Sequence, residues 1–430
     1  MFPRRSFLQK AGSFSLAALF GPWLQPAWSR DLQRALQQAA DTPPASLASD
    51  EDFWRYVQQA YTVSAALVNL NNAGMAPAPK VVQEAMKRYH DLSNEAPSYF
   101  MTRVLDLGRE PLRRNLAALA GVGAEEIALQ RNATEALETV IFGLPLQKGD
   151  EVVLARQDYP SMINAWKQRE QRDGIRLVWV NLQLPSEDND YLAKAYTSAF
   201  TARTKVVQVT HLVNWNGQVL PVKRIADAAH ARGIEVLVDG AQSFAHLKFA
   251  VPDTGADYFG ASLHKWLSAP IGTGLLYVKK EKIGRLYPLF ASIAQGETDI
   301  RKFEHLGTRP FFIEQAVGKA VDFHDMIGGQ RKEERLLYLK NYWMERVAGF
   351  SKVRLGTSLK PGFGCAIGLV SVDGKAPREL EAFLMDHYKV HTVAIDQETI
   401  KGVRVSPNVY TTTKELDVLV EGIRHGARTV

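Results

Sequence analysis

The chain has 430 residues, of which 46% are hydrophobic and 23% charged, and its formal net charge is +6. This composition is typical of a globular protein large enough for two subdomains, and the modest charge, without a basic block, argues against nucleic-acid binding. The single cysteine, Cys365, excludes an intrachain disulfide and a metal cluster built on cysteines. We expect no metal site.

The first 29 residues have the features of an export signal. The pair Arg4-Arg5 precedes a short apolar run at 11–24, too mild to anchor the chain in a membrane, and 27–29 fits a small-x-small cleavage site. The segment resembles a twin-arginine signal, which exports folded proteins, so we expect the twin-arginine (Tat) translocase as a partner and the periplasm as the location. A disordered basic N-terminus is the alternative. Removing residues 1–29 would lower the net charge to +3, because they contain three basic residues and no acidic one.

Residues 30–75 are expected to form an N-terminal segment that joins a small domain. Apolar residues recur at helical spacing over 52–61, which predicts a helix there. A strand then leads into a tight loop that contains Asn71 and Asn72. These side chains either form a turn or face a binding site.

Two amphipathic helices are expected next, at 80–90 and 106–120. The second carries Arg109, Arg113 and Arg114, which we expect to be surface or interface charges. From about residue 76 to 280, short apolar strands alternate with helices, and this order predicts a mostly parallel sheet with helices on both faces. The expected strands are 127–130, 151–155, 176–182, 205–209, 236–239 and 258–261.

Asp239 and Lys265 are the two residues around which the chain is organised. Asp239 ends a buried strand, Lys265 follows the next apolar segment, and ligands of open α/β sheets bind beyond the carboxyl ends of strands. A pyridoxal 5'-phosphate (PLP) site needs such a pair: the lysine forms the Schiff base, and the carboxylate keeps the pyridine nitrogen protonated. Either residue alone would be an ordinary cap or a solvated amine. Together, and with Gln242, Ser262 and His264 beside them, they indicate PLP.

The segments 239–242 (DGAQ) and 262–270 (SLHKWLSAP) resemble the class V aminotransferase family, and specifically its isopenicillin N epimerase-like branch. The resemblance extends over nearly all of the chain after about Asn69. It implies a fold-type I PLP-dependent transferase of the α/β class. The large PLP-binding domain would span residues 76–314, with a mostly parallel sheet between helices, and a smaller α+β domain would span 315–430. The resemblance also implies that the strand at 274–278 is antiparallel.

The resemblance implies a role for each cofactor contact. Lys265 would form the Schiff base and, once substrate displaces it, move a proton at the α-carbon, while Asp239 would pair with the pyridinium. Tyr159 stands where many relatives have a histidine that stacks on the ring. Asn214 and Gln242 would bind the phenolic oxygen.

The implied phosphate contacts come from several segments. They are Ala133, Thr134, Ser262 and His264, with Thr308 supplied by a partner chain. For the first two, backbone N–H groups at a helix N-terminus make an anion site, although an ordinary capped helix is the alternative. For His264, a general base is the alternative. A contact from Thr308 implies a homodimer with its sites at the interface.

The substrate contacts implied by the resemblance are Arg404 and Asn72. Arg404 would bind the substrate α-carboxylate through a bidentate fork. Trp215 either lines the substrate pocket or packs in the core. Cys365 is expected to be a buried hydrophobe, and residues 385–397 hold no cysteine where desulfurases carry their nucleophile, so desulfuration is rejected.

The export signal and the PLP site together resemble the periplasmic PLP enzymes of pyoverdine maturation. Those enzymes modify the glutamate at the amino end of the siderophore precursor. We therefore expect conversion of that glutamate to a succinamide group. Transamination to α-ketoglutarate, epimerisation of an amino acid, and an inactive PLP-fold binding protein are the alternatives.

Overall fold

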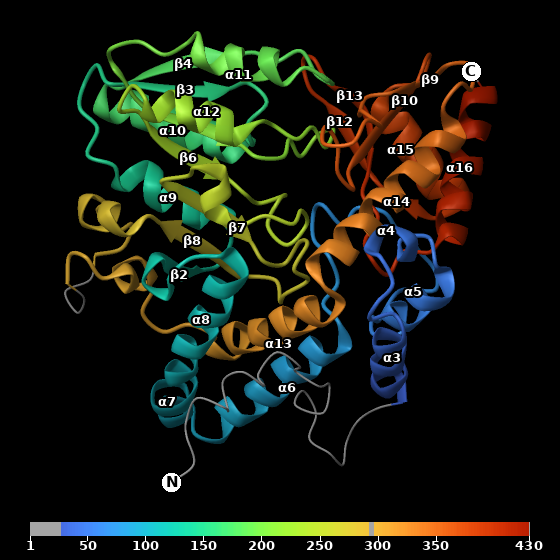
Figure 1. Ribbon diagram of the computed structural model, residues 1–430, viewed down its shortest axis with the longest axis horizontal. Helices are drawn as coiled ribbons and strands as arrows, with labels where there is room; N and C mark the ends of the chain where they lie inside the picture. Colours follow the sequence, from blue (N-terminus) through green and yellow to red (C-terminus); the bar gives the residue numbers. More distant parts are fainter. Residues whose placement is uncertain (1–26, 292–295, 430) are drawn as a thin grey trace.

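The computed structural model describes residues 27–291 and 296–429, and Figure 1 shows them as a larger and a smaller domain. The larger domain is built on a seven-stranded sheet, and the predicted α/β class is confirmed. In sheet order its strands are β2 (Ile127–Gln130), β8 (Gly274–Val278), β7 (Tyr258–Ser262), β6 (Glu235–Asp239), β5 (Thr204–Thr210), β3 (Glu151–Ala155) and β4 (Arg176–Val180).

The strand directions follow the prediction. The pairs from β7 through β6, β5 and β3 to β4 are parallel. β8 is antiparallel to both of its neighbours, β7 and β2, as expected for 274–278. The carboxyl ends of β5, β6 and β7 therefore lie at one edge of the sheet.

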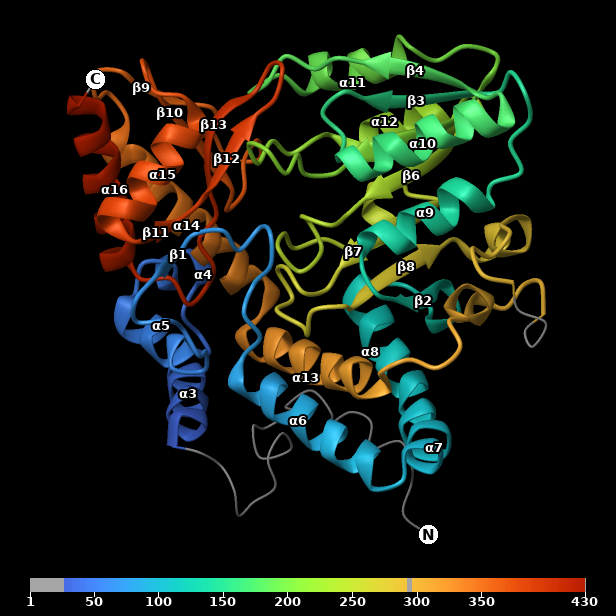
Figure 2. The same cartoon turned by 180° about the vertical axis from the view of Figure 1, so that it is seen from behind.

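Both faces of this sheet are buried under helices. Successive side chains of each strand point to opposite faces, so one strand contributes to two hydrophobic clusters. In β6, Val236 and Val238 join one hydrophobic cluster while Leu237 joins another on the opposite face. Helices α9 and α10 cover the second face (Figure 2), and α8, α11, α12 and α13 cover the first. Their bounds are α8 (Arg109–Ala120), α9 (Ala133–Gly143), α10 (Pro160–Asp173), α11 (Asn189–Thr197), α12 (Val222–His230) and α13 (Phe311–Ile327).

The smaller domain has a four-stranded antiparallel sheet and its own hydrophobic cluster. Its elements are α14 (Gly329–Val347), β9 (Val353–Leu355), β10 (Gly368–Val372), α15 (Pro377–Tyr388), β12 (Val393–Asp396), β13 (Lys401–Val405) and α16 (Thr413–Arg428). The N-terminal segment lies against this domain: β1 (Val68–Asn69) pairs in parallel with β11 (Val390–His391), and α4 (Pro44–Leu47) packs on α14.

The chain from residue 27 enters the fold through helices. α3 (Ala27–Gln38) buries Ser29 and Leu32, so residues 27–29 of the predicted export signal belong to a helix; residues 1–26 lie outside the described part. α5 (Glu51–Gln58) follows, and then α6 (Lys80–Glu95), which packs along α13 at the base of the larger domain (Figure 1). α7 (Pro97–Phe100) and a short π-helical turn lead to α8.

Arg114 is exposed, but the expectation that Arg109 and Arg113 are surface or interface charges is wrong. Both are buried, with 9% and 2% of their surface exposed. Arg109 Nη2 lies 2.8 Å from Glu304 Oε2, and Arg113 pairs with the same carboxylate while donating to the backbone oxygen of Ile127 (2.7 Å). The spacing of charges along a helix does not reveal that a distant glutamate will occupy its buried face.

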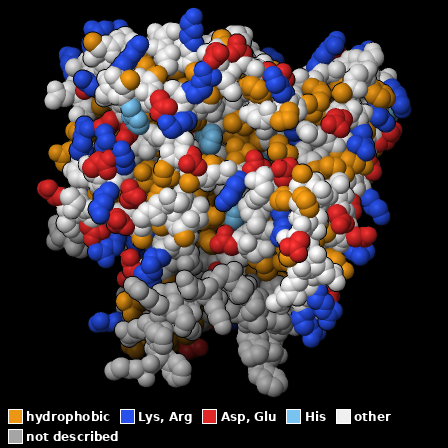
Figure 3. All heavy atoms as spheres, in the orientation of Figure 1, with side chains coloured by type: hydrophobic (Ala, Val, Ile, Leu, Met, Phe, Trp, Pro, Cys, Tyr) orange, Lys and Arg blue, Asp and Glu red, His pale blue; other side chains and the backbone are white. Residues whose placement is uncertain are grey.

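The molecular surface carries mixed charges. On the face shown in Figure 3, lysine and arginine side chains are interspersed with aspartate and glutamate. Among the described residues, no helix has the length and apolar character needed to cross a bilayer, and no group of His, Cys, Asp and Glu could hold a metal ion.

Candidate active site

A cavity of about 280 Å³ opens at the carboxyl ends of β5, β6 and β7. It is bounded by the N-termini of α9 and α10 and by β13 of the smaller domain, so it lies between the two domains. Most of the predicted site residues meet in it: Ala133, Thr134, Tyr159, Asn214, Asp239, Gln242, Ser262, His264, Lys265 and Arg404.

Lys265 lies in a turn directly after β7. Backbone N–H groups of Ser268 and Ala269 close this turn onto the carbonyls of Lys265 (3.2 Å) and Leu263 (3.0 Å). Burial lowers the pKa of Lys265 to about 8; the charge of Asp239 opposes this shift and that of Arg404 adds to it. A lysine with a lowered pKa is more often neutral near pH 7, and the neutral amine is the nucleophile.

Asp239 ends β6 with one carboxylate oxygen occupied and one available. Its Oδ1 accepts the backbone N–H of Ala241 at 2.9 Å, whereas no described residue donates to Oδ2. Burial raises the pKa of Asp239, and the N–H of Ala241 and the charge of Lys265 lower it. A Cβ on Gly240 would lie 1.9 Å from Cζ of Phe259, so the turn after Asp239 requires glycine.

The orientation of the Gln242 amide is set by its neighbours. Its Oε1 accepts Trp266 Nε1–H at 2.9 Å, so the other end of the amide is Nε2, which donates to the Ala73 oxygen at 3.0 Å. Nε2 carries a second hydrogen that is available to the cavity. The backbone oxygen of Gln242 lies 2.8 Å from His246 Nδ1.

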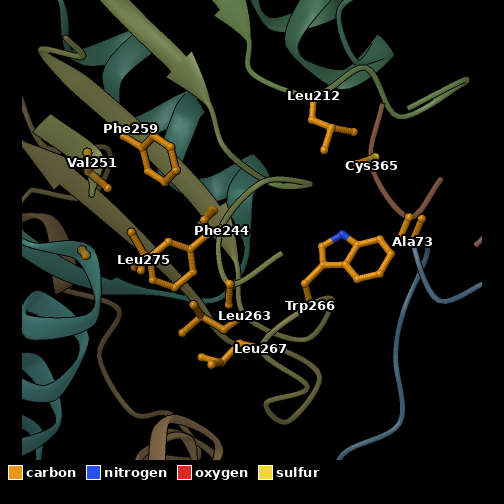
Figure 4. Packing of buried hydrophobic residues seen from close by; sticks show 14 of the residues in the cluster. Ala73, Leu212, Phe244, Val251, Phe259, Leu263, Trp266, Leu267, Leu275 and Cys365 are labelled. Carbon is orange, nitrogen blue, oxygen red and sulfur yellow. The ribbon is translucent and has the colours of Figure 1, made fainter. Parts of the chain in front are cut away.

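His246 contacts both Gln242 and Trp266 on the side away from the cavity. Its Nε2 accepts the Ala366 N–H at 3.0 Å, so its proton is on Nδ1, toward the carbonyl of Gln242. The ring stacks on Trp266 with centroids 3.7 Å apart. Burial lowers the pKa of His246 to about 3, so the ring stays neutral. Figure 4 shows the Trp266 indole turned toward Ala73 and Cys365, which belong to distant parts of the sequence.

The N-terminus of α9 forms the other end of the cavity. Asn132 Oδ1 caps the helix by accepting the N–H of Glu135 (2.9 Å), and Ser262 Oγ accepts the N–H of Ala133 (2.9 Å). The N–H of Thr134 has no partner among the described residues. Because Ser262 only accepts here, its own hydroxyl proton also remains available. These groups can bind an anion.

Arg404 extends from β13 into the cavity. Nη1 donates to the Asn214 oxygen at 3.0 Å and Nη2 to Asn71 Oδ1 at 2.8 Å, while Nε has no partner in the described structure. Burial lowers its pKa to about 10, with Tyr159 opposing the shift. The guanidinium remains charged at neutral pH and retains N–H groups for a carboxylate.

The structure does not bring Asn72 or Thr308 into this cavity. Asn72 is fully buried beneath it: its Nδ2 donates to the Ser406 oxygen (2.9 Å), and its Oδ1 accepts from Tyr410 (2.6 Å). Its neighbour Asn71 makes the contact with Arg404 instead. Thr308 is exposed and does not line the cavity of its own chain, so its contact with the phosphate of a partner chain stays a prediction.

Tyr159, His264 and Trp215 occupy different surroundings. Tyr159 is 43% exposed at the start of α10 and lines the cavity. His264 Nδ1 lies 3.3 Å from the Thr273 oxygen, which can only accept, so the proton of the neutral ring is on Nδ1 and a hydrogen bond from Nε2 to a phosphate requires a second proton. Burial and then the charge of Lys265 lower the pKa of His264, which opposes that protonation. Trp215 is buried and borders a second cavity.

Sequence reasoning missed Asp158. It is fully buried and accepts the Ala155 N–H (2.9 Å) and the Thr210 hydroxyl (2.6 Å). Burial raises the pKa of Asp158 to about 7, and the nearby charge of Asp239 adds to the shift. The signal was present: Asp158 follows the end of β3 much as Asp239 ends β6.

The free donors and acceptors of the cavity match the groups of PLP. Asp239 Oδ2 can accept from a ring N–H, Gln242 Nε2 can donate to a phenolic oxygen, and the α9 N-terminus with Ser262 can hold a phosphate. The neutral amine of Lys265 can bond to an aldehyde. Bound there, PLP would supply an electron sink for the bonds at a substrate α-carbon. On a mostly parallel sheet with β8 reversed, this chemistry defines a fold-type I PLP-dependent enzyme.

Comparison with known proteins agrees with this class. The family model "Aminotransferase class-V" matches residues 68–419, so the chain belongs to the class V aminotransferase family. It is 28% identical over 390 residues to an isopenicillin N epimerase of Amycolatopsis lactamdurans, covering 86% of this chain and 98% of that protein. It is 27% identical to a probable cysteine desulfurase of Halalkalibacterium halodurans, covering 83% and 92%.

Solved structures share the fold at lower identity. A cysteine desulfurase from Thermococcus onnurineus superposes with a TM-score of 0.77 at 21% identity, covering 87% of this chain and 98% of that chain. A C-DES variant with glycine covalently linked to its PLP cofactor gives a TM-score of 0.75 at 22% identity, covering 84% and 97%. The expected fold type and cofactor class are thereby confirmed.

Proposed function

We propose that this PLP-dependent enzyme is exported folded to the periplasm and converts the amino-terminal glutamate of a pyoverdine precursor to a succinamide. The observation that carries the proposal is that Lys265 and Arg404 line one cavity. The substrate amine can thus be held at the cofactor while its α-carboxylate is held by the guanidinium. The twin arginine at Arg4-Arg5 supports export.

The stoichiometry of the proposed conversion requires an oxidant. The α-carbon loses its carboxyl group as CO₂ and becomes an amide carbon, so R–CH(NH₂)–COOH and O₂ give R–CONH₂, CO₂ and H₂O. Dioxygen is the oxidant: it is reduced while the α-carbon is oxidised to the amide carbon. The chain's own part is to hold the α-carboxylate through Arg404 and to move the α-proton through Lys265.

Desulfuration is disfavoured by the environment of Cys365. This thiol is fully buried, its Sγ lies 3.5 Å from the Gly217 oxygen, and burial raises its pKa to about 12. A nucleophilic cysteine needs a thiolate and access to substrate. Cys365 has neither.

Two other reactions of amino acids remain second candidates. Transamination of the same glutamate to α-ketoglutarate uses the same held amine and carboxylate. Epimerisation is favoured by the similarity to proteins named isopenicillin N epimerase. An inactive binding protein is disfavoured, because such a role does not need Lys265 and Asp239 together.

The test incubates purified holoenzyme with glutamate-bearing pyoverdine precursor or with free glutamate, in air and under anaerobic conditions. Oxygen-dependent formation of the succinamide product, followed by mass, supports the proposal. A keto product that forms without oxygen supports transamination, and inversion at the α-carbon supports epimerisation. Reaction with free amino acids alone contradicts both siderophore functions.

The location has its own test. Cell fractionation followed by immunoblotting should find a shortened protein in the periplasm, and Arg4→Lys with Arg5→Lys should retain the full-length protein in the cytoplasm. A full-length cytoplasmic protein in the unmodified strain contradicts export.

A further inference from the structure

A second cavity, of about 350 Å³, lies beside the active site, and we refer to it as the annex. Its wall includes Arg156, Lys167, Trp179 and Trp215 from the larger domain. Glu398, on the turn between β12 and β13 of the smaller domain, closes the other side. The annex therefore lies between the two domains, as the active-site cavity does.

The two cavities share their dividing wall. In the first two turns of α10, Met162 borders the active-site cavity while its neighbour Ile163 borders the annex. Asn214 and Trp215 divide in the same way. Figures 1 and 2 both show loops of the larger domain reaching toward β12 and β13 of the smaller domain.

The annex has an excess of positive charge that no described residue neutralises. The Arg156 guanidinium and the Lys167 amine lie 5.8 and 5.9 Å from the centre of the Trp179 ring, and neither forms an ion pair with a described residue. Lys167 lies on α10, and both arginines of that helix, Arg169 and Arg172, pair with Asp173. The annex therefore presents two cations.

One carboxylate, Glu398, faces these cations across the cavity without pairing with either in the described structure. Two cations against one carboxylate favour an anion as the occupant. Trp179 and Trp215 provide flat surfaces beside the charges, and Asn181 adds an amide. Such a wall suits a polar, extended group with a negative end.

The active site decides which part of a substrate can reach the annex. An amino acid held by its amine at Lys265 and by its α-carboxylate at Arg404 has only its side chain left to extend. Arg404 donates to the oxygen of Asn214, whose neighbour Trp215 borders the annex. A substrate that extends over this wall through its side chain reaches the annex.

We propose that the annex binds a carboxylate at the far end of a substrate that is extended through the side chain of its reacting amino acid, such as a γ-glutamyl peptide. The inference rests on the proposed function only in that the enzyme acts on a free α-amino group. It deepens that function by assigning the far end of the substrate, a distal carboxylate, to a second subsite outside the active-site cavity.

The test measures binding to the holoenzyme by isothermal titration calorimetry. The probes are L-glutamate and γ-L-glutamyl peptides with one, two or three glycines, each as the free C-terminal acid and as the C-terminal amide. At least one acid should bind about fivefold more tightly than its own amide, as expected for two partly exposed charge contacts. The double variant Arg156→Gln/Lys167→Gln should lose this preference and bind L-glutamate unchanged.

Two further variants act as controls of opposite kinds. Lys148→Gln removes an exposed lysine beside Gly174, beyond the far end of α10, and should leave every affinity unchanged. Glu398→Gln removes the opposing carboxylate and should strengthen binding of the acids.

The annex is refuted if no acid is preferred over its amide, or if the preference survives in the double variant. Preference for an acid without conversion of the pyoverdine precursor would refute the proposed reaction and leave the annex intact.

Discussion

Two walls of the interdomain region differ in how their polar groups are satisfied. The inner wall is made of Asp239, Gln242 and Lys265, with Trp266 and His246 behind them. Hydrogen bonds from Ala241 to Asp239 and from Trp266 to Gln242 leave one acceptor and one donor available for the cofactor. The outer wall is made of Arg156, Lys167 and Trp179, and its two charges contact the Trp179 ring but form no ion pair with a described residue.

The difference separates two tasks. A cofactor of constant shape is best held by groups that are already oriented, since the cost of ordering them is met during folding. A substrate that arrives and leaves needs accessible charges whose contacts are individually weak. Substitutions in the inner wall should therefore affect cofactor chemistry or stability, and those in the outer wall should affect only the choice of substrate.

Lys265→Ala should cause the largest loss. Removing the amine abolishes the covalent bond to the cofactor and the proton transfer at the α-carbon, and we expect kcat to fall by roughly 10³-fold. Steady-state kinetics and the absorbance spectrum of the purified protein measure both effects. Lys148→Ala is the matched control. A Lys265→Ala protein that keeps the spectrum of lysine-bonded cofactor would contradict the central assignment.

Asp239→Asn should lower kcat by roughly 10²-fold, because a fixed charge opposite the ring nitrogen is lost. It should also change the pH dependence of covalent cofactor uptake by the apoenzyme. The charge of Asp239 raises the pKa of Lys265, so its removal should move the midpoint of uptake below about 8, toward lower pH. Stopped-flow absorbance across pH measures this midpoint, and an upward shift would show that the two groups do not interact as described.

Trp266→Phe tests the support behind Gln242. It removes the Nε1–H that Gln242 Oε1 accepts and leaves that buried oxygen unsatisfied, at a cost of about 1–2 kcal/mol in the free energy of unfolding. Urea denaturation measures this cost. Trp179→Phe in the outer wall keeps a ring and loses no hydrogen bond, so it should change stability by less than about 0.5 kcal/mol. Equal effects of the two variants would remove the distinction between the walls.

Among the substitutions in and behind the inner wall, Cys365→Ala should have the smallest effect. The residue lies behind the inner wall, and losing its sulfur should lower the free energy of unfolding by about 1 kcal/mol. Activity should be unchanged, because the buried thiol takes no part in the reaction. A large fall in kcat without a fall in stability would reopen the desulfurase alternative.

Much of the fold was predictable because buried parallel strands are short apolar runs with turn residues at their ends. The expected strand at 151–155 matches β3 in full, and 274–278 matches β8 in position and direction. α10 was not predicted, because its buried face includes Arg169, whose guanidinium donates to backbone oxygens such as that of Leu144 (3.1 Å). A charged residue on a buried helix face conceals the apolar stripe.

The residues of the candidate site, too, could be predicted from the sequence only in part. Asp239 and Lys265 were identifiable because each follows a strand and carries a group that PLP requires. Which of Asn71 and Asn72 faces the cavity could not be predicted, since the side chains of adjacent loop residues point in different directions. Contacts with Ser406 and Tyr410, more than 330 residues away, hold Asn72 in the interior and leave Asn71 to meet Arg404.

The sequence by itself determined the alternation of strands and helices, the strand ends that carry Asp239 and Lys265, and the resemblance that pointed to PLP. These features are local, because a strand, a turn and a helix cap are each written in a few consecutive residues. The tertiary structure decided which side chains remain unsatisfied: the free oxygen of Asp239, the oriented amide of Gln242, and the unpaired cations of the annex. Whether a donor, acceptor or charge stays unsatisfied depends on residues that are distant in the sequence and close in the fold. No short stretch of sequence contains both partners of such a contact.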